Sequence, residues 1–184
     1  MAKDWKEALK ALDGFRVLAA HRNGPLGVNG LNKTIESWLA HHKSLGFSTK
    51  REHYVGRPIL ITSNDKEQEL YNGDVGFIGT NDAGQPVGIF PDSEGYRQVP
   101  VARLPPHETV YAMTIHKSQG SQFTHALVAP PVEPSRIVTR ELLYTAVTRA
   151  AKYVTIIGSE ASLEAGVKQK VSRTSGLSDA LRRD

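Results

Sequence analysis

The feature that most constrains the fold is a polar segment between two strand-like runs. Residues 111–116 alternate and are partly β-branched, which indicates a strand, and residues 126–129 form a second apolar run. The polar segment between them, residues 117–122, contains Gly120, which permits a sharp turn of the backbone. The pattern predicts a strand that ends in a tight loop and is followed by another strand.

This arrangement would bring five polar side chains to one place. They belong to Thr114, His116, Lys117, Ser118 and Gln119. Two hydroxyls, an imidazole, a cation and an amide, with no carboxylate nearby, suit the binding of an anionic phosphate backbone better than acid–base chemistry. The alternative is a polar turn in which the serine and threonine hydroxyls bond to their own backbone.

Helix-like and strand-like segments alternate through much of the chain. Residues 3–12 and 28–39 carry apolar side chains at helical spacing, and residues 15–20 form an apolar run between them. Residues 152–158 form a further apolar run, which we interpret as a buried strand. This alternation is typical of an α/β domain with a parallel sheet.

The pattern of predicted secondary structure changes near residue 56 and changes back near the two prolines at 105 and 106. Short β-like runs alternate there with turn sequences such as Asn-Gly-Asp, which predicts a small antiparallel barrel. Exposed aromatic side chains on such a barrel could stack on bases. Tyr71 and Tyr96 stand next to turns and are the candidates, with packing in the protein interior as the alternative.

The segment that starts at Thr139 reads as a helix. Thr139 can cap its first turn, and Glu141 suits its positive end. An apolar stripe is predicted along one side, made of Leu143, Ala146, Val147 and Ala150. Arg149 would lie on the opposite side. There it is either part of a solvated face or an arginine finger, a guanidinium that neutralises the charge on a transferred phosphoryl group.

A second candidate arginine follows the first strand. Loops at the carboxyl ends of parallel strands usually form the binding edge of an α/β sheet. Arg22 stands in such a loop, beside several glycine and proline residues. The alternative is an exposed arginine without a role.

Two of these segments resemble motifs of one enzyme family. Thr-Ile-His-Lys-Ser-Gln-Gly-Ser, residues 114–121, resembles motif V of superfamily 1 DNA helicases in its RecD-like form, and residues 141–150 resemble motif VI. Arg22 stands where the family has motif IV. Residues 71–76 resemble the Asn-Gly-Asp-x-Gly stretch of a small SH3-like insertion in these helicases. The resemblance runs from about Phe15 to Leu177.

The resemblance implies a fold and a division into domains. Residues 1–55 and 107–184 would form the second RecA-like motor domain, called 2A, with the parallel sheet of P-loop NTPases. Residues 56–106 would form the SH3-like barrel, called 2B. The expected function is that of the C-terminal motor half of an ATP-dependent helicase that moves 5′ to 3′ along DNA. Other subunits of an exodeoxyribonuclease V complex and single-stranded DNA would be the partners.

The resemblance also assigns roles to residues. Arg149 and Arg22 would act on the nucleotide, with Gly120 and Gln122 close to it, and the five polar residues of the loop would contact DNA. The family commonly has Glu where this chain has Gln122. The chain has no G-x-x-x-x-G-K-[ST] sequence, so ATP and Mg²⁺ would be held mainly by a preceding domain, 1A. The isolated chain would then lack ATPase and helicase activity.

Two alternatives stay open: the helicase part of a relaxase–helicase, and a non-catalytic module that binds nucleic acid on a RecA-like scaffold. The net charge of +4 permits contact with nucleic acid without requiring it. The chain has no cysteine, and its seven histidines show no metal-ligand spacing. We expect a cytoplasmic protein that binds no metal itself and no membrane.

Overall fold

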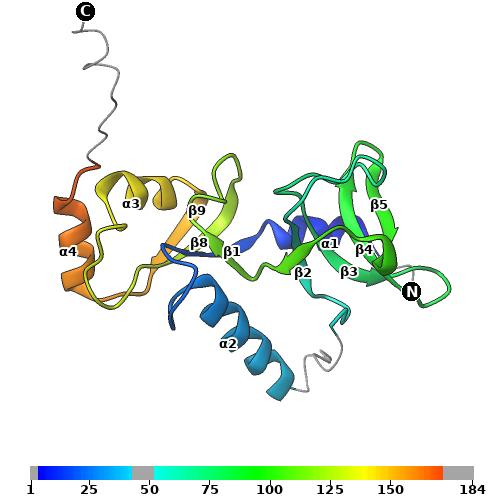
Figure 1. The fold of residues 1–184 in the computed structure, drawn as a ribbon, viewed down its shortest axis with the longest axis horizontal. Coiled ribbons are helices and arrows are strands. Elements are labelled where there is room, and N and C mark those ends of the chain that lie inside the picture. The colour runs from blue at the N-terminus through cyan, green and yellow to red at the C-terminus, as the bar shows by residue number, and fades with distance from the viewer. Residues whose placement is uncertain (1–3, 43–51, 172–184) are drawn as a thin grey trace, which may run out of the picture.

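The computed structural model describes residues 4–42 and 52–171. Two sheets lie next to each other along the long axis of the molecule (Figure 1). One is a four-stranded sheet with the order β7-β1-β8-β9, and its pairings are all parallel. The other is a five-stranded antiparallel sheet with the order β5-β4-β3-β2-β6. The predicted parallel α/β arrangement is thus confirmed.

The parallel sheet is built around β1 (Phe15–Ala19), whose residues are buried from Arg16 onward. Its neighbours are β7 (Ala112–Thr114) and β8 (Phe123–Ala129), and β9 (Ala150–Ile156) forms the edge next to β8. The register places Ala19 beside Thr114 and also beside Ala129. The carboxyl ends of three neighbouring strands therefore meet at one edge of the sheet.

Helices cover this sheet on both sides (Figure 1). On one side α2 (Val28–His41) packs near β7, and on the other α3 (Arg140–Val147) and α4 (Glu160–Lys168) pack together. The hydroxyls of Thr139 and Ser159 accept hydrogen bonds from amides in the first turns of α3 and α4, as the sequence predicts. None of the helices in the described ranges is both long and apolar enough to cross a bilayer.

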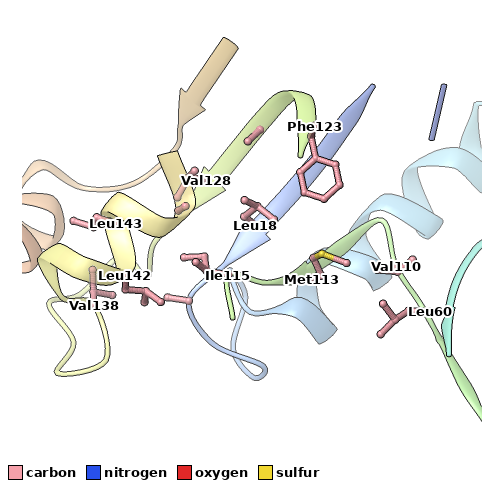
Figure 2. Packing of buried hydrophobic residues seen from close by; sticks show 13 residues of the cluster. Leu18, Leu60, Val110, Met113, Ile115, Phe123, Val128, Val138, Leu142 and Leu143 are labelled. Carbon is pink, nitrogen blue, oxygen red and sulfur yellow. The ribbon is translucent and has the colours of Figure 1, made fainter. Parts of the chain in front are cut away.

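One hydrophobic core joins the two sheets. Leu18, Ile115 and Val128 pack under Leu142 and Leu143 of α3 (Figure 2). The same cluster continues through Met113 and Val110 to Leu60, which belongs to the antiparallel sheet (Figure 2). Packing across this boundary holds the two sheets against each other.

The antiparallel sheet contains the short strands that the turn pattern predicts between residues 56 and 106, and one further strand, β6, after the two prolines. They are β2 (Pro58–Ile61), β3 (Val75–Thr80), β4 (Pro86–Asp92), β5 (Gly95–Pro100) and β6 (His107–Thr109), with a 3₁₀ turn at Val101–Arg103. Gly84 and Gly95 have φ of +76° and +124°, so glycine is required at these two turns. Phe77 and Phe90 are buried, as expected for core residues.

The first helix, α1 (Trp5–Leu12), packs mainly on the antiparallel sheet. Trp5, Ala8, Leu9 and Leu12 contact a small cluster formed by Phe77, Val87 and Ile89. The ring centroids of Trp5 and Phe77 lie 5.6 Å apart. The N-terminal segment thus crosses from one sheet to the other before β1 begins.

The prediction of a buried strand at residues 152–158 is wrong. Strand β9 is exposed along nearly its whole length, and 64% of the surface of Tyr153 is accessible. The physical reason is that, among the residues of β9, only Ala150 packs against a hydrophobic cluster of the described residues, whereas β7 at the opposite edge is buried next to α2. An apolar run in the sequence marks a strand, but its neighbours decide whether that strand is buried.

Candidate functional site

The candidate site is formed by the polar loop (residues 115–122), which leaves the carboxyl end of β7. The loop closes one tight turn, in which the amides of Ser118 and Gln119 donate to the carbonyls of Thr114 and His116, each over 3.2 Å. Gly120 ends the turn with a φ of +89°. The predicted sharp turn at this glycine is confirmed, because a side chain is disfavoured at that φ.

Two hydroxyls of the site stabilise the turn itself. The oxygen Oγ1 of Thr114 accepts a hydrogen bond from the amide of Lys117, at 3.2 Å. The hydroxyl of Ser118 is fully buried and donates to the carbonyl of Ile115, at 2.7 Å. The alternative of a turn that satisfies its own backbone therefore describes these two groups. His116, Lys117 and Gln119 are exposed.

The loop after β1 meets the polar loop at a shallow hollow of about 420 Å³. Arg22, Thr114 and His116 line it together, and the remaining lining residues are Ala20, His21, Asn23 and Ile137. Residues singled out in two distant stretches of sequence are thus brought to one place. The cause is the pairing of β1 with β7, which aligns the carboxyl ends of the two strands.

The backbone around Arg22 is fixed by the start of α2. The amides of Val28 and Asn29 donate to the carbonyls of His21 and Arg22, at 3.0 and 2.9 Å. The side-chain amide of Asn29 also donates to Asn23, at 3.0 Å. These contacts occupy amides that a helix start would otherwise leave free, so the loop holds Arg22 in one position.

A carboxylate lies at this site, contrary to the expectation that none would be near. The two oxygens of Glu108 contact Arg22 Nη2 at 2.7 Å and Lys117 Nζ at 2.9 Å. Burial alone would raise the pKa of Glu108, but the hydrogen bonds and positive charges of Lys117 and Arg22 outweigh it and hold this pKa below its ordinary value. Glu108 lies on β6, six residues before Thr114, and no local pattern marks it as part of the site.

The spacing predicts that Arg149 lies on the face of a helix. In the structure α3 ends at Val147 and Thr148 forms its C-cap, so Arg149 lies beyond the helix. The buried residues of α3 are Leu142, Leu143 and Ala146, whereas Val147 is 41% exposed. The stripe predicted from residue 143 onward is therefore shifted toward the N-terminus. The earlier end of the helix explains the position of Arg149. The exposure of Val147, which lies within α3, shows that the buried face of the helix also differs from the predicted one.

The guanidinium of Arg149 reaches back to the polar loop. It donates to the carbonyl of Ser121 at 3.1 Å and to the carbonyl of Thr145 at 3.3 Å. The carbonyl of Arg149 accepts from the amide of Phe123 at 2.8 Å, where β8 begins. None of the ion pairs between described residues includes Arg149. Its charge is therefore available to an anion that approaches from outside this part of the chain.

The remaining candidates lie elsewhere. Tyr71 is 50% exposed in the connection between β2 and β3, where the Asp74 carboxylate accepts from its amide at 2.8 Å. Tyr96 is partly buried against the cluster under α1. Gln122 is exposed at the end of the polar loop. Neither tyrosine lines the hollow at Arg22 and Thr114.

A buried arginine supports the site from below. Arg16 donates to the backbone carbonyls of Val110 and Leu12, and its guanidinium lies 5.2 Å from the centre of the Phe123 ring. Burial lowers the pKa of Arg16 to about 10, and the nearby charge of Asp13 opposes this shift. Arg16 thereby ties β1 to Val110, two residues before β7, and to Phe123, the residue after the polar loop.

The site contains no arrangement suited to a metal ion. The described residues include no group of three or more His, Asp or Glu side chains that could hold one. What the site offers instead is cations, amides and an imidazole around a hollow, which is the chemistry of phosphate binding.

Comparison with known proteins shows that these segments are similar in sequence to parts of helicases. The profile of the UvrD-like helicase C-terminal domain matches residues 109–157, which include the polar loop, α3 and Arg149. The chain is 45% identical over 170 residues to the RecBCD enzyme subunit RecD of Mycobacterium tuberculosis. It is 40% identical over 178 residues to the same subunit of Haemophilus influenzae.

These similarities cover most of this chain and a smaller part of its relatives. The matches include 92% and 96% of this chain, but 29% and 27% of the two RecD subunits, so the chain spans less than a third of their length. The structure of a Pif1 helicase from Bacteroides in complex with ADP-AlF₃ and single-stranded DNA is also similar. That similarity has a TM-score of 0.49 at 17% identity, over 91% of this chain and 44% of the Pif1 chain.

Proposed function

Because the chain belongs to the RecD-like branch of the superfamily 1 DNA helicases, we propose that it is the C-terminal motor part of an ATP-dependent helicase that moves 5′ to 3′ along DNA. The longer polypeptide that contains it is called the parent protein below. The observation that carries the proposal is the junction of Arg22, Thr114 and His116 at one hollow, next to a loop that Arg149 contacts.

We assign domain 2A to residues 1–55 and 107–184 and the SH3-like domain 2B to residues 56–106. The separation of the parallel sheet from the antiparallel sheet supports this division. The antiparallel sheet begins after α2, and the chain returns to the parallel sheet at β7. Its two outer strands, β5 and β6, would face each other in a closed barrel. In this division α1 and β6 belong to domain 2A, although α1 packs on the antiparallel sheet and β6 pairs with β2 of that sheet. The two domains would therefore be in contact through these two elements.

The polar loop would bind the phosphates of a single strand of DNA. His116, Lys117 and Gln119 offer exposed donors for this contact, and Arg22 adds a guanidinium from the neighbouring loop. Thr114 and Ser118 would contribute by holding the turn in shape. Tyr71, and less directly the partly buried Tyr96, would offer rings on which bases can stack.

Arg149 would be the arginine finger. A bound ATP supplies free energy through hydrolysis of its terminal phosphate, and domain 1A of the parent protein would hold the nucleotide and Mg²⁺. Arg149 would face that phosphate, together with the Gly120–Gln122 end of the loop. The resemblance also assigns Arg22 to the nucleotide, but Arg22 lines the hollow with Thr114 and His116 and is linked to Lys117 through Glu108, so we assign it to a DNA phosphate instead. A guanidinium drawn toward a phosphate would leave the carbonyl of Ser121, so the polar loop would respond to the state of the nucleotide site.

The chain alone would have neither ATPase nor helicase activity, since the phosphate-cradling loop would lie on domain 1A. The partners of the parent protein would be single-stranded DNA and the other subunits of an exodeoxyribonuclease V complex. The relatives named as subunits of the RecBCD enzyme support the second assignment.

A measurement of DNA binding tests the role of the polar loop. The double variant His116→Ala/Lys117→Ala of the parent protein should bind single-stranded DNA at least about tenfold more weakly than wild type. Lys33→Ala, which removes an exposed cation from α2, is the control and should leave the affinity unchanged. Equal binding by wild type and the double variant would contradict the proposed contact.

A further inference from the structure

The carboxylate of Glu108 stands between the two cations that the proposed function assigns to phosphate binding. One oxygen contacts Arg22 at 2.7 Å and the other contacts Lys117 at 2.9 Å. Arg22 comes from the loop after β1 and Lys117 from the polar loop. A single side chain on β6 therefore links a cation of one loop to a cation of the other.

The arrangement matches the way in which a phosphate diester would be bound. A diester presents two charged oxygens on one atom, and Glu108 presents two oxygens on one carbon, with one cation at each. All three side chains are partly exposed, at 51% for Arg22, 32% for Lys117 and 29% for Glu108, so an incoming anion can reach both cations. The low pKa of Glu108 agrees with a carboxylate that stays ionised there.

We propose that Glu108 occupies the phosphate position between Arg22 and Lys117 when DNA is absent, and that a backbone phosphate of single-stranded DNA displaces it. The inference rests on the proposed function, because it assumes that the polar loop binds DNA. Glu108 then has two opposing effects. It holds both cations in place before DNA arrives, and it competes with the phosphate for them.

Competition is the larger of the two effects. Glu108 cannot withdraw far, because β6 is paired with β2, with Glu108 beside Leu60. A phosphate bound by Lys117 would remain within a few ångströms of the carboxylate, and two negative charges at that distance repel each other. The ordering effect is smaller, because exposed ion pairs contribute little and the loop is already held by Thr114 and Ser118.

Glu108→Gln in the parent protein separates these effects. Glutamine keeps the shape and a hydrogen-bonding oxygen while it removes the charge. In the absence of nucleotide, single-stranded DNA should bind the variant about threefold to tenfold more tightly than wild type.

Two further variants test the cause. Glu108→Gln combined with Lys117→Gln should lose most of the gain, because the cation that the glutamate restrains is missing. Glu164→Gln removes the same charge from the ion pair with Lys168 on α4 and should leave DNA binding unchanged. A merely structural role for Glu108 would not produce tighter binding.

The outcomes are distinguishable. If wild type binds DNA and Glu108→Gln binds equally or more weakly, the inference is wrong and the proposed function stands. An equal gain in the presence and absence of Lys117 also contradicts the inference. If wild type itself does not bind single-stranded DNA, the proposed function fails and the inference fails with it.

Discussion

Arg149 donates a hydrogen bond from its guanidinium to the carbonyl oxygen of Ser121, 3.1 Å away. The contact joins the segment after α3 to the last residues of the polar loop, so two motifs that lie 28 residues apart in sequence act on one point. A change in the position of Arg149 would alter this hydrogen bond and so affect the loop that carries His116 and Lys117. In the proposed function, this hydrogen bond would link the nucleotide site to the DNA site.

The buried hydroxyl of Ser118 should be important for stability. Ser118→Ala removes its hydrogen bond to the carbonyl of Ile115 and should lower the free energy of unfolding by about 1–2 kcal/mol. Chemical denaturation measures this change. Ser37→Ala, at an exposed position of α2, is the matched control and should have an effect below about 0.5 kcal/mol. A similar loss in both variants would show that the hydroxyl does not hold the turn.

Arg16 should be the most sensitive charged residue of the parallel sheet. Arg16→Met leaves the carbonyls of Val110 and Leu12 without their donors and should cost about 2–4 kcal/mol of unfolding free energy. Methionine fills a similar volume, so the loss would report the hydrogen bonds more than the packing. Unfolding by urea, compared with Arg136→Met at an exposed position, checks this prediction. Unchanged stability of Arg16→Met would contradict it.

The two tyrosines should behave differently. Tyr71→Ala should weaken the binding of single-stranded DNA, by about 1–3 kcal/mol if a base stacks on the ring, with little effect on stability. Tyr96→Ala should instead lower stability, because that ring packs on the cluster under α1. Binding titrations and thermal unfolding of both variants separate the two roles. Normal DNA binding by Tyr71→Ala would remove this residue from the proposed interface.

Acid should weaken the protein partly through Glu108. Its pKa is lower in the folded than in the unfolded chain, so the folded state binds fewer protons between the two values. The stabilisation is present above the unfolded pKa and is lost as pH falls through the folded pKa. Between about pH 6 and pH 3.5, wild type should lose more unfolding free energy than Glu108→Gln, by about 0.2–1 kcal/mol. Parallel curves for the two proteins would contradict this prediction.

Local features of the fold could be predicted from the sequence, because their causes are local. The hydroxyls of Thr139 and Ser159 stand directly before their helices, and Gly120 stands at the turn that needs it. The parallel sheet also followed from the alternation of apolar segments. The closed barrel, the domain boundaries and the functional assignments remain predictions.

What could not be predicted depends on distant neighbours. The contact of Glu108 with Arg22 joins residues 86 positions apart, and nothing near either residue indicates it. Strand β9 has the apolar run of a buried strand, but beyond Ala150 its side chains pack against no hydrophobic cluster of the described residues, and Tyr153 is exposed. The end of α3 at Val147 moves Arg149 off the helix, and this shift follows from the start of β9 at Ala150.

The most direct test of the central claim is the ATPase activity of the parent protein with single-stranded DNA, for wild type and Arg149→Ala. Arg140→Ala is the control, since Arg140 is an exposed arginine at the start of α3. We predict a loss of about a hundredfold or more in Arg149→Ala, with ATP still bound and Arg140→Ala close to wild type. Normal hydrolysis by Arg149→Ala would contradict the arginine-finger assignment and leave Arg149 as a residue that only tethers the polar loop.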